Sequence, residues 1–304
     1  MVEPLQAFYS DCFVLPLPER HRFPISKYAR LREHLASILP RDRITFCVPP
    51  AATDEQLLRV HSATYLDKVK AGNLSDIEER RIGFPWSPAM VERSRRSTGA
   101  TLQAAHEALR TGVAVNLAGG THHAFADHGQ GYCVFNDVAV AIRHVQASSD
   151  PQQFVVVDCD VHQGNGTAAI FSEDDTVTTC SLHGANNYPF AKCESDIDVP
   201  LPDGTDDDAY LAALQDCLQL KLDLAAAEMM FYVAGADPFH GDRLGRLALT
   251  KEGLRRRDAM VVSACLEHEL PLVITMAGGY ADDVQDIVDI HANTVMAAMQ
   301  RLAC

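Results

Sequence analysis

Short runs of apolar residues, separated by longer stretches with helical spacing, recur along the chain and predict strands of a buried sheet. Runs of this length without polar alternation are typical of strands that helices cover on both faces. A turn that contains glycine or begins with a carboxylate follows each run. The four clearest runs are 113–117, 154–157, 231–234 and 272–276.

Local signals place helices between these strands. Ser87, followed by a proline, predicts the N-cap and first turn of a helix, and Gly112 predicts its end. A threonine–aspartate pair predicts a second helix over about 53–72. The charged segment 75–88, which also contains prolines and aromatic residues, is expected to be a surface loop.

The alternation of strands and helices predicts an α/β fold with a central, mostly parallel sheet and helices on both faces. The 304 residues suffice for one large domain with a covered core, so we expect a single domain over 1–304. Ligand sites of such sheets lie at the carboxyl ends of the strands, where we expect the active site.

Composition narrows the class of protein further. Hydrophobic residues make up 47% of the chain, which excludes disorder, and no apolar run is long enough to predict a membrane span. The N-terminal residues Met1 to Pro4 lack the pattern of a signal peptide. Nine cysteines without paired spacing indicate reduced thiols, and we expect a cytoplasmic protein.

The formal net charge of −15 makes nucleic acid an improbable ligand. An acidic surface favours cationic partners instead, and lysine-rich peptides are among them.

Candidate chemistry lies in the turns that follow the strands. Asp158, Asp160 and His162 come directly after one run, and alternation along an extended segment places them on one side. Two carboxylates and one imidazole suit a divalent metal such as zinc. The alternative is a glycine-rich loop with solvated acids. The turns after the other three runs add two adjacent histidines, a carboxylate and a tyrosine, which are His122, His123, Asp237 and Tyr280.

Together these segments resemble the histone deacetylase superfamily, which includes bacterial deacetylases and acetylpolyamine hydrolases. They follow the family's order and span most of the chain, and the resemblance implies an arginase/deacetylase-like fold. The details of 162–166, 241–245 and 18–24 look most like the class IV branch and its bacterial relatives. The matching segments are 119–123, 131–137, 158–166, 181–183, 235–237, 241–245 and 278–280.

The resemblance implies the roles of the metal ligands. Asp160, His162 and Asp237 match the family's zinc ligands, and three protein ligands leave a coordination position open for catalysis. Two oxygens and one nitrogen also suit iron(II) or cobalt(II).

The resemblance also implies the acid–base and oxyanion groups. His122 and His123 would transfer protons, with Asp158 as the partner of His122. Asn165 would be the partner of His123, where some branches carry aspartate, so this position bears on which histidine is the base. Tyr280 would donate its hydroxyl to the developing oxyanion.

Four further positions would shape the substrate pocket. Gly131 and Tyr132 resemble the walls of the acyl-lysine channel. Thr121 replaces a tryptophan of many relatives, which implies a wider pocket foot. Leu244 lies at a rim position where a carboxylate would favour polyamines. The neighbouring segment 241–243 shapes the pocket floor or rim, or else its aspartate and arginine form a structural ion pair.

Potassium is a further cofactor that the resemblance implies, largely through backbone carbonyls. The residues matching one site are Asp158, Asp160, His162, Ser181 and Leu182, and those matching part of a second site are Phe171, Asp174 and Val177.

Three functions remain open at this point. The first is a zinc-dependent lysine deacylase that acts on an acyl-lysine protein or peptide and removes an acetyl or longer fatty acyl group. The second is a small-molecule amidohydrolase acting on acetylpolyamines or similar small acylated amines. The third is a non-catalytic metal-binding interaction protein, which is expected to lack a ligand or the tyrosine.

Overall fold

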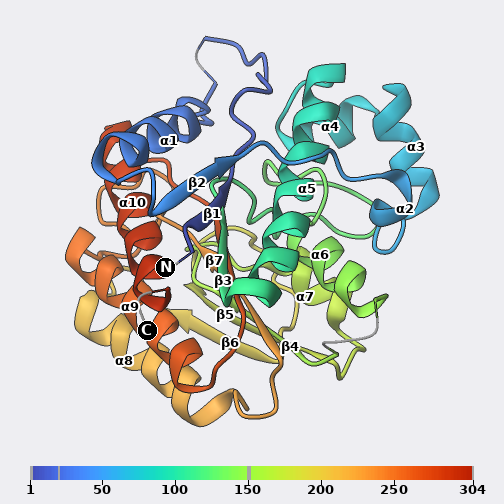
Figure 1. Cartoon of the computed structure of the whole chain (residues 1–304). Helices are drawn as coiled ribbons and strands as arrows, with labels where there is room; N and C mark the ends of the chain where they lie inside the picture. The colour runs from blue at the N-terminus through green and yellow to red at the C-terminus, as the bar shows by residue number, and fades with distance from the viewer. Residues whose placement is uncertain (1–2, 20, 149–151, 303–304) are drawn as a thin grey trace.

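The computed structural model describes residues 3–19, 21–148 and 152–302. Three residues used in the sequence analysis lie outside the described residues. They are Met1 and Val2, which belong to the N-terminus expected to lack a signal peptide, and Arg20 of the 18–24 segment. One sheet of eight parallel strands forms the centre, in the order β2-β1-β3-β8-β7-β4-β5-β6 (Figure 1). The strands are β1 Leu5–Phe8, β2 Ile44–Cys47, β3 Val113–Asn116, β4 Phe154–Asp158, β5 Val177–Gly184, β6 Ile197–Leu201, β7 Met229–Ala234 and β8 Leu272–Met276.

Helices cover both faces of this sheet, as the alternating pattern predicted (Figure 1). The helices are α1 Ser26–Ile38, α2 Asp54–Leu57, α3 Ala63–Ala71, α4 Asp76–Ile82, α5 Pro88–Thr111, α6 Asp137–Gln146, α7 Asn165–Phe171, α8 Asp207–Asp216, α9 Lys251–Glu267 and α10 Val284–Arg301. A π-helical turn, η1 Cys217–Lys221, continues α8. Within the described part of the chain, no helix is long and apolar enough to cross a membrane.

Two apolar cores lie on opposite faces of the sheet, because successive side chains of a strand point in opposite directions. In β4, Val155 and Val157 join the core beneath α1, α8, α9 and α10. Phe154 and Val156 join the core beneath α3, α5 and α6. Every residue of β4 is buried, which explains why the strand reads as a continuous apolar run.

The four strands predicted from apolar runs are direct neighbours in the sheet, in the order β3-β8-β7-β4. Because all four are parallel, their carboxyl ends and the turns that follow lie at one edge. The predicted site residues therefore meet although up to about half of the chain separates them.

The predicted caps of α5 are confirmed. The Ser87 hydroxyl accepts a hydrogen bond from Met90 N at 3.0 Å, and Gly112 ends the helix with a φ of 91°. Glycine adopts this left-handed conformation without the steric cost that other residues incur.

Two predictions for the preceding segment hold only in part. The predicted helix start at Thr53 and end at Gly72 are confirmed, but the residues between them do not form one helix. Residues 53–72 form two helices, α2 and α3, because Ser62 acts as a new N-cap and accepts from Tyr65 N at 3.3 Å. The segment 75–88 is not simply a loop, since it contains α4. A capping box between Ser75 and Glu78 starts α4, and Gly83 ends it.

Candidate active site

A buried cluster of possible metal ligands lies at the carboxyl edge of the central strands. Asp160 and His162 follow β4, and Asp237 follows β7. His162 Nδ1 lies 2.9 Å from Asp160 Oδ1 and 3.2 Å from Asp237 Oδ2. One possible ligand atom from each of the three residues lies within 4.8 Å of the other two. The structure thus brings together the three residues that the sequence singled out.

The donor set fits a divalent cation. Asp237 Oδ2 is buried and has no hydrogen-bond partner among the described residues. Burial and the neighbouring charge of Asp160 raise the pKa of Asp237 to about 7. Such a crowded, partly unsatisfied carboxylate is costly unless a cation neutralises it. Two carboxylates and one imidazole match the ligands of catalytic zinc sites.

The backbone holds the remaining carboxylate oxygens in place. Gly278 N donates to Asp160 Oδ2 at 2.7 Å, and Val161 N donates to Asp237 Oδ1 at 2.9 Å. A Cβ atom at Gly278 would collide with Asp237 Oδ2, so this turn requires glycine. The Gly-Gly-Tyr turn after β8 therefore orients a ligand that follows β4.

Arg257 of α9 holds the two turns that carry the possible metal ligands after β4 and β7. Its guanidinium is fully buried and donates to Gly235 O at 2.6 Å and to Cys159 O at 3.3 Å. The Asp258 carboxylate balances its charge at 2.8 Å. Sequence reasoning missed this residue, because an arginine within an amphipathic helix is usually exposed.

The two histidines have different partners. His122 Nδ1 donates to Asp158 Oδ2 at 2.6 Å, and His123 Nδ1 donates to Asn165 Oδ1 at 2.8 Å. Burial by itself lowers the pKa of His122, but the Asp158 and Asp160 carboxylates outweigh it and raise the pKa to about 9.

The pKa of His123 is lowered well below its usual value by burial and by the neighbouring His122 and His162. Asn165 offers His123 a hydrogen bond but no charge. The pKa values of the two histidines are therefore shifted in opposite directions.

Tyr280 completes the cluster. Its side chain is buried, and its ring centre lies 6.3 Å from that of His162. Burial, with the added effect of Asp237 and Asp160, raises the pKa of Tyr280 well above its usual value. The hydroxyl therefore stays protonated and is able to donate a hydrogen bond. Asp242 accepts from Tyr280 N at 2.5 Å and so fixes the backbone of this turn.

A cavity of about 460 Å³ leads to these residues. Gly131, Tyr132 and Leu244 line it together with His123, His162 and Tyr280, as expected for channel and rim positions. Gly131 has a φ of 56°, and a Cβ atom there would lie 2.6 Å from His123 Cδ2. Glycine at this position lets the backbone pass close to the His123 ring.

Thr121 lies behind the metal ligands. It lines two small cavities of about 50 Å³ each, one of which also contacts His122, His162 and Tyr280. Thr121 Oγ1 lies 2.6 Å from Asp137 Oδ1. Asp137 also accepts from Gly120 N and Thr121 N, so it holds the turn that carries the two histidines. This carboxylate is part of the matched segment 131–137, but sequence reasoning gave it no role.

The predicted ion pair between Asp242 and Arg243 is wrong. Asp242 accepts from the amides of Leu244, Gly245 and Tyr280. Arg243 Nε instead donates to Tyr280 O at 2.7 Å and lies 3.3 Å from Asp282. Backbone amides thus take the place of Arg243 at Asp242, and Asp282 takes the place of Asp242 at Arg243.

The residues predicted for potassium lie beside the site. Asp158 on β4 pairs with Ser181 on β5, and Leu182 is buried next to it. The second predicted group spans the link from α7 to β5, where Asp174 forms an ion pair with Arg143. These two potassium sites stay predictions.

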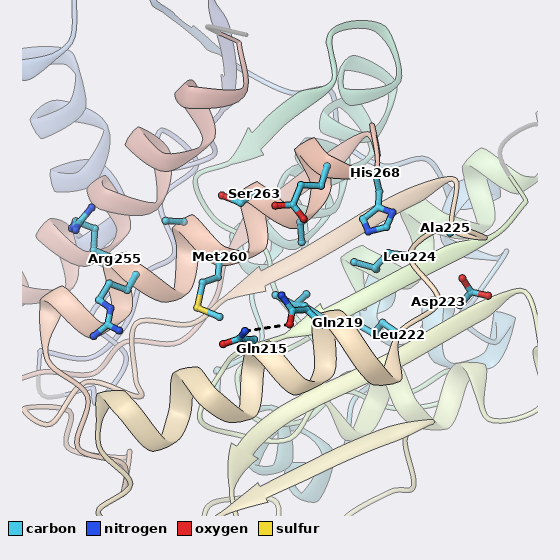
Figure 2. Close-up of a pocket in the computed structure, with 15 residues that line it drawn as sticks. Gln215, Gln219, Leu222, Asp223, Leu224, Ala225, Arg255, Met260, Ser263 and His268 are labelled. Carbon is cyan, nitrogen blue, oxygen red and sulfur yellow. Dashed lines mark hydrogen bonds between the residues drawn. The ribbon is translucent and has the colours of Figure 1, made fainter.

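A larger cavity lies elsewhere and is lined by none of the predicted site residues. It has a volume of about 800 Å³ and lies between α8–η1 and α9. Figure 2 shows Arg255 and Met260 along α9 and His268 at its end, facing Gln215 and Gln219. Size alone favours this cavity, but the smaller cavity is lined by His162 of the possible metal-ligand cluster, by His123 and by Tyr280. We therefore assign the chemistry to the smaller one.

Comparisons with known proteins agree with this geometry. The model of the histone deacetylase domain matches residues 21–295. An uncharacterized protein of Picosynechococcus sp. is 42% identical over 287 residues, which cover 93% of this chain and 95% of that protein. Histone deacetylase 2 of Arabidopsis thaliana is 30% identical over 279 residues, with 89% and 72% covered. A histone deacetylase-like amidohydrolase of Pseudomonas aeruginosa is 34% identical over 251 residues, with 77% and 65% covered.

Solved structures share the fold. The crystal structure of a histone deacetylase homologue from Aquifex aeolicus superposes with a TM-score of 0.80 at 23% identity and covers 96% of this chain and 82% of that one. A homologue solved in complex with SAHA gives a TM-score of 0.81 at 24% identity, with 99% and 84% covered. With the domain match over most of its length and the relatives of 30% identity or more, this chain belongs to the histone deacetylase family.

Proposed function

We propose that the protein is a metal-dependent amide hydrolase that removes an acyl group from a lysine side chain. The observation that carries this proposal is the convergence of Asp160, His162 and Asp237 with His123 and Tyr280 at the inner end of one cavity. A non-catalytic interaction protein is expected to have lost one of these groups, and the chain retains all of them.

Zinc is the metal that this donor set favours, although iron(II) and cobalt(II) also suit two oxygens and one nitrogen. When bound, such an ion polarises the amide oxygen and lowers the pKa of water. Asp160, His162 and Asp237 would hold it. One oxygen of each aspartate already accepts a hydrogen bond from a backbone N–H, so the two carboxylates need little reorganisation when the ion binds.

His123 is the general base in this proposal. Because His123 Nδ1–H donates a hydrogen bond to Asn165 Oδ1, the proton of the neutral imidazole stays on Nδ1, and Nε2 is free to accept a proton from the attacking water. Its lowered pKa keeps it neutral near pH 7, and it can pass the proton to the leaving amine. His122, which Asp158 keeps protonated, supplies positive charge, and Tyr280 donates to the oxyanion.

Cavity size supports a short acyl group. The two cavities beside Thr121 hold about 50 Å³ each, room on the order of a few water molecules. A fatty acyl chain needs a pocket on the order of several hundred Å³. We therefore favour acetyl over longer acyl groups, in spite of the small residue at position 121.

Free thiols support a reducing compartment. Eight of the nine cysteines lie within the described residues, and all eight are unpaired. Because disulfides form mainly in oxidising compartments, we propose a cytoplasmic protein. Potassium beside the metal site remains part of the proposal on family resemblance alone.

The test is a rate series with the purified protein. Peptides carrying acetyl-, octanoyl- and myristoyl-lysine, and acetylputrescine as a small acylated amine, are incubated with enzyme loaded with zinc, and the released acid is measured. We expect the acetyl-lysine peptide to react fastest, activity to vanish with a strong chelator, and zinc to restore it. Absence of hydrolysis on every substrate, at full zinc occupancy, would refute an amide hydrolase.

A further inference from the structure

Arginine side chains surround the mouth of the active-site cavity. Arg80, Arg81, Arg243 and Arg246 line the cavity itself, and all four are exposed. A fifth exposed arginine, Arg22, lines an adjoining hollow of about 320 Å³ together with Arg243, Leu244 and Tyr280. Neither cavity has an aspartate or glutamate among its lining residues. We call these five residues the arginine rim.

The arginine rim contrasts with the rest of the chain. Acidic residues outnumber lysine and arginine by 41 to 26, and the net charge is −15. A cavity lining with five arginines and no acid is therefore a local reversal of the protein's overall charge. The sign of the local charge at the cavity mouth, rather than the net charge of the protein, determines which substrates are attracted there.

Three separate parts of the fold build the rim, and hydrogen bonds tie them to one another and to the channel walls. Next to Arg22, His21 Nε2 lies 2.9 Å from the carbonyl oxygen of Gly83, the residue that ends α4. Gly131 N donates to Arg81 O at 3.0 Å at the end of α4. The Arg243 side chain donates to Tyr280 O at 2.7 Å, and Arg246 N donates to Asn187 Oδ1 at 3.2 Å. The backbone of each segment, and the side chain of Arg243, are therefore held at fixed places relative to the channel.

Most of this positive charge is not neutralised within the chain. Arg243 lies 3.3 Å from Asp282, and Arg246 lies 3.2 Å from Asp203, both at exposed positions where ion pairs are weak. Within the described residues, Arg22, Arg80 and Arg81 have no carboxylate within 4.0 Å. The helix dipole alone could explain the presence of Arg80 and Arg81, because positive charge in the last turn of a helix is stabilising. It does not explain Arg22, Arg243 or Arg246, which do not lie in the last turn of a helix.

We propose that the arginine rim selects acylated amines that carry negative charge on the part of the molecule that stays outside the channel, such as acyl-lysine flanked by acidic residues. This inference rests on the proposed function and deepens it. It places acetylpolyamines, which carry an ammonium at that position, among the poor substrates. It also reverses the expectation that an acidic protein recruits lysine-rich peptides to its site.

The test compares two peptides with the same central acetyl-lysine, one flanked by glutamates and the other by lysines. At low ionic strength we expect kcat/KM to be about tenfold higher for the glutamate peptide, and this ratio to fall towards one at about 1 M salt, where the Debye length is roughly 3 Å. Equal values at low salt, or a preference for the lysine peptide, would overturn the inference and leave amide hydrolysis intact.

Two double variants localise the effect. Replacing Arg80 and Arg81 by glutamine should lower the ratio several-fold, chiefly through KM. The matched control is replacement of Arg255 and Arg256 by glutamine, since these two neighbouring arginines are also exposed but line the distant cavity of Figure 2. The control should keep the wild-type ratio. A loss of the same size in both pairs would show that only the overall charge matters, which contradicts a local rim.

A further comparison, between two small molecules, determines whether the negative charge must lie on flanking residues or is sufficient on the acyl-lysine itself. Nα,Nε-diacetyl-lysine with a free carboxylate is compared with its uncharged carboxamide. A preference for the carboxylate shows that a charge directly beside the lysine suffices, so small acids qualify as substrates. A preference seen only among the peptides shows that the rim reads flanking acidic residues. No preference in either pair would refute the inference.

Discussion

The ammonium group of Lys27 lies 5.4 Å from the centre of the Tyr280 ring, in the interior beneath the active site. It donates to Ala277 O at 3.0 Å and to Gly279 O at 3.4 Å. These two carbonyls flank Gly278, whose amide donates to the metal-ligand candidate Asp160. Lys27 therefore holds the turn that carries Tyr280 and orients a carboxylate. No ion pair to Lys27 is found among the described residues.

Lys27→Met should lower kcat about tenfold and change KM little. The substitution keeps the length of the side chain but leaves two buried carbonyls without their donor, which costs about 1–3 kcal/mol per group. The turn would then hold Tyr280 less firmly, while the substrate channel stays intact. Steady-state kinetics measure this split, and circular dichroism verifies the fold. Lys27→Arg, which keeps the charge and donors, is the matched variant and should recover part of kcat; a rise confined to KM would contradict the positioning role.

Tyr280→Phe should lower kcat by roughly 10²–10³-fold, as for removal of one oxyanion-hole donor. The ring is buried and packs near Phe23 and Tyr132, so phenylalanine should fill the same space. KM should stay near the wild-type value. A change in KM alone would make Tyr280 a substrate-binding residue instead.

Asn165→Asp should move the acidic limb of the kcat/KM profile to higher pH by about one to three pH units. In the wild type the pKa of His123 is lowered, so His123 stays neutral and active down to low pH. A carboxylate at the 2.8 Å position of Asn165 Oδ1 would favour the imidazolium, raise this pKa and remove the base at a higher pH. Profiles measured over pH 4–9 on the acetyl-lysine peptide test this sign. An unmoved acidic limb would contradict His123 as the base.

The two histidines can also be compared directly. His123→Ala should cost more activity than His122→Ala, because only His123 is neutral and has its Nε2 free. If His122→Ala proves the more damaging change, the proposed division of labour is wrong.

Asp237→Ala should yield a folded protein that binds little metal and lacks activity. Asp237 contributes the buried oxygen that has no other partner, and its removal also relieves the crowding with Asp160. Metal content per chain, measured after dialysis against zinc, is the readout. Asp223→Ala, at the wall of the distant cavity, is the control and should keep full occupancy. Full occupancy in Asp237→Ala would remove this residue from the ligand set.

The sequence by itself was sufficient for the central strands and for the residues that the structure brings together at their carboxyl ends. Strands β3, β4, β7 and β8 are buried on both faces, so their sequences are almost wholly apolar without polar alternation, and a turn that carries candidate site residues follows each directly. Caps such as Ser87 and Gly112 are local signals that involve only neighbouring residues. The match to a known family then supplied roles for residues whose spacing alone left them open.

Tertiary structure decided what depends on contacts between distant segments. Charge and proline content in 75–88 suggested a loop, whereas a local capping box forms α4 there. Only the fold, however, brings Arg80 and Arg81 of its last turn to the cavity mouth. Lys27 lies in α1, and no motif surrounds it in the sequence. Its contacts become evident only in the fold, where it donates to Ala277 O beside the Gly-Gly-Tyr turn, 250 residues later in the chain. The arginine rim likewise exists only because three distant segments meet, since a local charge pattern does not specify which surface its side chains will share.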